Sequence, residues 1–221
     1  MTIQGLMDAI DVSKGIVIVK DKSAVRSAMD GLVYEAVFEP DDEKRKARFI
    51  LIKEIAKAYG AIPASIQGLY EDMGRHYPGF TVPAMNIRGL TYDAVRAAYR
   101  KAHELKVGPM IFEIARSEIG YTKQRPLEYA AVILAAAVRE GHEGPVFIQG
   151  DHFQLVRKNY LADPGPEVNY IKDLIAEALD AEFYNIDIDS STLVDLSQST
   201  IREQQRPNFE RTAELAWHVR Q

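Results

Sequence analysis

Four strand patterns alternate with four helix patterns after Gly79, and this alternation constrains the fold more than any other feature of the sequence. The predicted strands are 80–86, 109–114, 146–149 and 183–189. Helix patterns begin near Thr91, Pro126 and Pro164, and we expect Pro207 to mark a break before the closing helical segment. Short strands alternating with helices are typical of a parallel sheet covered by helices.

The number of units predicts an incomplete barrel. Residues 79–221 hold four βα units, whereas a closed eightfold barrel takes about 250 residues. We therefore expect an α/β fold of the TIM-type (βα) barrel in which only the first four βα units are present, in a chain that is truncated.

Residues 1–78 show a different pattern. Helical periodicity covers roughly 42–59 and 65–75, without a clear alternation of strands, although Ile16–Val19 could form a short strand. We therefore divide the chain into a helical N-terminal extension, residues 1–78, and a half barrel, residues 79–221.

Composition excludes several classes of protein. The net charge of −5 comes from mixed signs along the chain, so no basic stripe indicates binding to nucleic acid or to anionic lipid. The start of the chain has no signal-peptide pattern, and no apolar run is long enough to span a membrane. Cysteine is absent, so a transition metal would have to be bound by His, Asp or Glu. These features favour a soluble cytoplasmic protein.

Asp151 and His152 are the first candidates for chemistry, because they follow the apolar strand pattern 146–149 directly. Parallel α/β sheets hold their active sites at the carboxyl ends of the strands. A carboxylate can transfer a proton, and a neighbouring imidazole can bind a metal. The structural alternative is that both side chains cap loops by hydrogen bonds to the backbone.

The order of the strand-end residues resembles the N-terminal half of class II, metal-dependent fructose-bisphosphate and tagatose-bisphosphate aldolases. The resemblance covers about 80–221 and rests on four segments, which are Val82–Asn86, the stretch around Ser117, Gly150–His152 and Ser191–Ser197. It implies a zinc-dependent lyase of glycolysis and related carbohydrate metabolism that cleaves a phosphorylated keto-sugar.

The resemblance also implies roles for single residues. Asp151 would be the general acid that handles the proton of the substrate hydroxyl, and His152 would be a Zn²⁺ ligand. Asn86 would contact substrate, and Ser117 falls near a serine that contacts substrate phosphate, although Ala115–Glu118 departs from the usual local pattern. Asp195 matches an aspartate that can meet a metal or another cation near the site.

Each of these residues has a structural alternative. Asn86 could form a turn, and Ser117 and Asp195 could each be the N-cap of a following helix. Glu113 lies inside an apolar strand pattern, so its carboxylate either meets a cation, as a weak candidate metal ligand, or points into the site.

The metal site is predicted to be incomplete in this chain. The family completes its zinc site with two later histidines, whereas the other four histidines here fall in predicted helices or loops. Two other functions therefore stay open: a non-catalytic companion subunit of an aldolase, and an inactive fragment that acts by association. We expect a homo-oligomer, or association with a missing C-terminal half.

Overall fold

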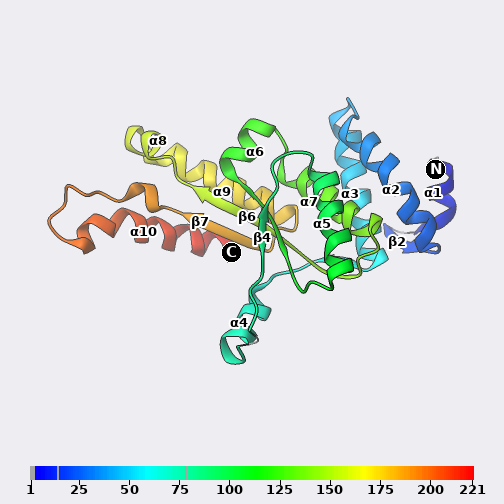
Figure 1. Cartoon of the computed structure of the whole chain (residues 1–221). Helices are drawn as coiled ribbons and strands as arrows, with labels where there is room; N and C mark the ends of the chain where they lie inside the picture. Colours follow the sequence, from blue (N-terminus) through cyan, green and yellow to red (C-terminus); the bar gives the residue numbers. More distant parts are fainter. Residues whose placement is uncertain (1–2, 14, 78) are drawn as a thin grey trace.

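A computed structural model describes residues 3–13, 15–77 and 79–221 (Figure 1). Its centre is a sheet of five parallel strands, which are β3 (Ala61–Pro63), β4 (Ala84–Asn86), β5 (Ile111–Ala115), β6 (Gly144–Gln154) and β7 (Asn185–Asp189). Strands β4, β5, β6 and β7 lie side by side in chain order, and β3 pairs with the first residues of β6. The long strand β6 therefore organises the sheet, because three other strands pair with it.

Helix α7 (Pro126–Arg139) lies at the middle of the helical layer. It contacts α2 (Lys22–Val37), α3 (Asp42–Tyr59), α5 (Thr91–Leu105) and α9 (Pro164–Asp180). Its alanine-rich sequence is buried from Tyr129 to Val138 without interruption, as expected for a helix surrounded by other elements. Buried side chains of the sheet, among them Phe112, Ile148 and Phe153, belong to the same apolar core.

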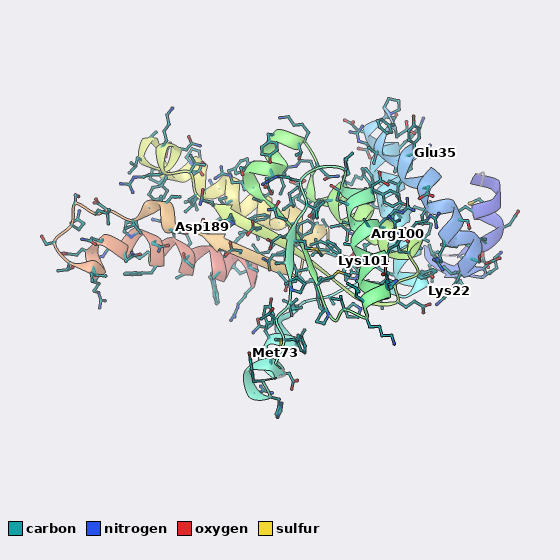
Figure 2. All side chains as sticks on the ribbon, viewed as in Figure 1. Lys22, Glu35, Met73, Arg100, Lys101 and Asp189 are labelled. Atoms are coloured by element: carbon teal, nitrogen blue, oxygen red, sulfur yellow. The ribbon has the colours of Figure 1, made fainter. Side chains whose placement is uncertain are left out.

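The remaining elements lie around this core. They are α1 (Ile3–Ala9), a hairpin of β1 (Ile10–Ser13) and β2 (Ile16–Val19), α4 (Gln67–Arg75), α6 (Arg116–Thr122), α8 (Arg157–Ala162), the short helix η1 (Ser191–Leu193) and α10 (Ile201–Val219). Helix α4 projects from the body, with Met73 on the projection (Figures 1 and 2), and it has no buried residue. No helix in the described ranges is both long and apolar enough to cross a membrane.

The structure confirms an α/β fold with a parallel sheet flanked by helices, and it confirms β2 at Ile16–Val19. Residues 1–78 also contain two strands that the sequence did not predict, since β3 joins the central sheet and β1 pairs with β2. Strand β3 has only three residues, which is too short to show a periodic pattern.

Two predicted boundaries also need correction. The first strand begins at Ala84 rather than at residue 80, and the preceding Pro83 has no N–H to donate to a neighbouring strand. Pro207 does not break the last helix but lies inside α10. That helix starts upstream, where the Thr200 hydroxyl accepts a hydrogen bond from the Glu203 N–H. A proline removes one helical hydrogen bond, which this helix tolerates.

Candidate functional site

One face of the sheet changes from apolar to polar along the strands. The pairing places Asn86, Glu113, Gln149 and Asn185 in one row across β4, β5, β6 and β7. Side chains alternate between the two faces of a strand, so Ile111 and Phe147, each two residues before a member of the row, lie on the same face. These two side chains form a small buried cluster with Ile66. The face therefore has an apolar floor at the strand starts and polar groups toward the carboxyl ends.

Asp151 and His152, in the second half of β6, come together with Asp187, the middle residue of β7. Their potential ligand atoms all lie within 4.8 Å of one another. Nδ1 of His152 is 2.8 Å from Oδ1 of Asp151, and the His152 side chain is 59% exposed while that of Asp151 is 16% exposed. The cluster is thus a half-open site with one imidazole and two carboxylates.

A bulge in β6 sets the direction of these side chains. The pairing of β6 with β7 shifts register between Gly150 and Phe153, and His152 adopts a left-handed backbone with φ of 42°. The His152 N–H donates to Oδ2 of Asp187 at 3.0 Å. Bulges commonly re-aim side chains next to active sites, and this one brings His152 beside Asp151.

Two groups of this face have shifted pKa values. The hydrogen bond to Asp151 raises the pKa of His152 and outweighs the desolvation that acts against it, and the carboxylates of Asp187 and Asp189 add to the rise. Burial and the nearby Asp151 charge raise the pKa of Glu113, although Gln149 donates to its carboxylate at 2.8 Å. Glu113 therefore lies within electrostatic reach of the cluster but is not one of its three members.

Asn86 lies next to the cluster and is held by a buried acid. Its amide donates to Oε2 of Glu118 at 2.9 Å and to Oδ2 of Asp151 at 3.4 Å. Glu118 also accepts from the Ala115 N–H at 2.8 Å and from Arg88 at 2.8 Å. The amide of Asn86 therefore links β4 to Asp151, in a contact that the turn alternative does not explain.

Ser117 shares a cavity with His152. Both residues line a cavity of about 240 Å³, together with Arg116 and Tyr170. The Arg116 guanidinium lies 4.4 Å from the centre of the Tyr170 ring and is ion-paired with the buried Glu167. The cavity therefore joins a hydroxyl, a guanidinium and the candidate metal ligand.

Asp195 lies outside the cluster. One carboxylate oxygen accepts from the N–H and hydroxyl of Ser197, at 3.1 and 2.7 Å, and the other accepts from Gln198 at 2.8 Å. The hydrogen bonds from Gln198 and Ser197 lower the pKa of Asp195 to about 2. These contacts form a local turn, and the N-cap alternative is wrong for Asp195, because the following helix α10 is capped by Thr200.

The sequence interpretation did not single out Asp187 or Glu118. Asp187 could have been found from the alternation in Asn185–Asp189, because period two places residues 185, 187 and 189 on one face. Asp189, labelled in Figure 2, accepts from Ser191 and Gln154 beyond the cluster. Glu118 gave no such signal, since the side chains that donate to it, Asn86 and Arg88, lie about 30 residues earlier in the chain.

The donor set fits a divalent transition metal. An imidazole nitrogen and a carboxylate oxygen are ligands that Zn²⁺ accepts, so His152 and Asp187 would supply two of the three protein ligands that catalytic zinc sites commonly use. The other histidines whose side chains are described do not join this group: His76 ends α4, His103 lies on α5, His142 precedes β6 and His218 lies on α10.

Comparison with known proteins finds no family model, no curated protein and no solved structure that matches the chain.

Proposed function

We propose that this chain is a class II aldolase-like lyase that uses Zn²⁺ to cleave or form a carbon–carbon bond in a phosphorylated keto-sugar of the fructose- or tagatose-bisphosphate type. The observation that carries the proposal is the convergence of Asp151, His152 and Asp187 on two neighbouring parallel strands, β6 and β7. The resemblance of the strand-end segments to class II aldolases supports the same reaction.

In this proposal His152 and Asp187 hold the metal, and Asp151 is left for proton transfer. When bound, Zn²⁺ supplies a Lewis acid that polarises a carbonyl oxygen. Aldol cleavage also requires a base that takes the proton from the substrate hydroxyl while the bond between the two carbons breaks. Asp151 is suited to this step because its carboxylate is half-buried beside the metal ligands.

Neighbouring residues would orient the substrate. The Asn86 amide, whose nitrogen donates to Glu118 and Asp151, would offer its oxygen as an acceptor beside Asp151, and Ser117 offers a hydroxyl in the adjoining cavity. Arg116 lines the same cavity and would attract a phosphate group, although it already pairs with Glu167. The polar row across the strands would then face the sugar hydroxyls.

We further propose that the four successive strands β4 to β7 are the first units of a TIM-type barrel and that the chain works as a homo-oligomer. Strand order that follows chain order, with every pair parallel, supports a barrel arrangement. A partner subunit would supply the further histidine ligands that class II aldolases use.

The first experiment measures zinc and turnover in the same samples. Wild type should bind about one Zn²⁺ per site, lose cleavage of fructose or tagatose bisphosphate after chelation, and regain it when zinc is restored. His152→Ala should lose the metal, whereas Asp151→Asn should keep it and lose turnover.

His76→Ala is the matched control, because His76 also pairs with an aspartate, Asp72, at 3.0 Å, but on the surface of α4. Full zinc occupancy in His152→Ala would overturn the ligand assignment. Cleavage that survives chelation would overturn the metal-dependent reaction.

A companion-subunit function is the second candidate, and it is favoured by the single imidazole in the cluster. On this alternative the chain has no turnover of its own and raises the activity or stability of an aldolase that is added to it. Turnover by the isolated chain that depends on Asp151 would exclude the alternative.

A further inference from the structure

A second cavity lies between helices α3, α7 and α9, and it shares no lining residue with the candidate site. Its volume is about 630 Å³, within the range of about 300 to 1,000 Å³ that is usual for ligand pockets. Phe49, Ile50 and Leu127 supply apolar wall, and Ala181 lines the cavity where α9 ends. Figure 1 labels the three helices.

The cavity is rich in cationic side chains. Those that line it are Arg45, Lys46, Lys53, Lys123 and Arg125. Arg45 pairs with Asp42 and Arg125 pairs with Glu177. Lys46 and Lys123 form no ion pair with the described part of the chain, so their charges are available to a ligand. The lining also holds four acids, of which Asp42 and Glu177 are the partners of these arginines, and the other two are Glu128 and Asp180.

Lys53 is the unusual member of this group, because lysine is rarely buried and this one is only 6% exposed. Its ammonium lies 3.1 Å from a carboxylate oxygen of Glu182 and donates to the Asp180 carbonyl at a long 3.4 Å. An ammonium has three N–H donors, and only the contact with the Asp180 carbonyl is a hydrogen bond within the described part of the chain, since Oε2 of Glu182 accepts none. A buried N–H without an acceptor costs free energy, so the Lys53 ammonium would be stabilised by a further hydrogen-bond acceptor from a ligand.

We propose that this cavity binds a small organic anion, with an apolar body against Phe49, Ile50 and Leu127 and an acidic group at Lys53 and Lys123. The anion is a carboxylate, sulfonate or phosphate, since each of these accepts hydrogen bonds from several ammonium groups. The site lies on the helical layer rather than at the strand ends, so its ligand is distinct from the sugar phosphate of the proposed reaction.

The test uses the fluorescent anion anilinonaphthalene sulfonate as reporter on the full chain, with octanoate and octanol as competitors. Octanoate should displace the dye from wild type, and octanol, which has the apolar body without the charge, should not. Lys123→Glu should weaken octanoate binding by about tenfold or more, because it replaces an attractive charge with a repulsive one. Lys53→Met should weaken it similarly while keeping the volume of the side chain.

Lys106→Glu is the matched control. Lys106 and Lys123 are both exposed C-cap residues with left-handed backbones, φ 54° and 63°, but Lys106 does not line the cavity. Its variant should bind octanoate within about twofold of wild type, because screening weakens distant surface charges. Equal affinities of the Lys123→Glu and Lys106→Glu variants would overturn the proposal, and so would displacement of the dye by octanol as effectively as by octanoate. If Lys53→Met does not fold, Lys123→Glu decides alone.

Discussion

The carboxylate of Asp187 on β7 accepts a hydrogen bond from the backbone N–H of His152 on β6, with 3.0 Å between the two atoms. The N–H reaches this carboxylate because His152 has a left-handed backbone in the bulge between Gly150 and Phe153. A candidate metal ligand on one strand thereby fixes the backbone that carries the other ligand. The geometry of the site and the local stability of β6 are therefore coupled.

This coupling predicts different outcomes for two substitutions at Asp187. Asp187→Ala leaves the His152 N–H without its acceptor and should lower the free energy of unfolding by about 1 kcal/mol. Asp187→Asn keeps an oxygen acceptor and should be close to wild type in urea denaturation. Both variants should bind zinc more weakly, because both lose the carboxylate. Equal stability of the alanine variant and wild type would show that the hydrogen bond does not hold the bulge.

The raised pKa of His152 predicts a pH dependence with a definite sign. The Asp151 hydrogen bond raises this pKa above its ordinary value of 6.5, so the pair contributes stability that is fully present below that value. The contribution is lost as pH rises through the pKa of the folded state. Zinc affinity should change in the opposite direction, because the metal and the proton compete for the imidazole.

NMR titration of the His152 ring would measure the shift directly. Asp151→Asn should move the pKa of His152 down toward its ordinary value. A His152 pKa that is unaffected by Asp151→Asn would contradict this cause.

Particular residues show how far the sequence could predict the site. Asp151 and His152 were found because an apolar strand pattern leads directly into them, and the structure places them side by side but inside β6, which continues past the predicted end at residue 149 to Gln154. Asn86 and Ser117 follow their strands in the same way and lie near the pair. Asp187 joins the pair only because the bulge re-aims His152, and a bulge leaves no clear mark in hydrophobic periodicity.

The fold could be predicted where hydrophobic periodicity extends over many residues. Prediction failed where an element is too short to show periodicity or where a local signal was misleading. The alternation after Gly79 identified the strands and helices of the sheet because each helix pattern runs for several turns. Three-residue β3 joins the sheet through pairing with β6 over Ala61–Pro63, which is a tertiary contact. Pro207 was misread because the cap at Thr200 starts α10 before it.

Glu118 predicts a stability effect at the edge of the site. Burial alone would raise its pKa, but hydrogen bonds from Ala115, Arg88 and Asn86 outweigh burial and hold the pKa below its ordinary value. This contribution to stability is present above the ordinary glutamate pKa and is lost as pH falls through the folded-state value.

Glu118→Ala should lower the free energy of unfolding by about 2 kcal/mol at neutral pH, because it leaves the buried Ala115 N–H without an acceptor. Glu118→Gln should cost less, since its amide oxygen can still accept. Denaturation in urea at neutral and acid pH measures both. The free energies of unfolding of the alanine variant and wild type should differ less at acid pH. If this difference did not shrink, the charge of Glu118 would not contribute to stability.

The close approach of Gly150 to Phe153 predicts that the bulge has no room for a side chain at position 150. A Cβ atom at this position would lie 2.6 Å from the Phe153 ring, which is fully buried and has little room to move. Gly150→Ala should therefore cost about 2 kcal/mol through overpacking and should displace His152, with a loss of zinc affinity. Gly68→Ala on α4 is the matched control, because a Cβ there meets nothing within 4 Å and alanine favours a helix. Urea denaturation and zinc titration of both variants would test this. If Gly150→Ala matched Gly68→Ala in both measurements, the tight contact between Gly150 and Phe153 would not be what shapes the bulge and the ligand that it carries.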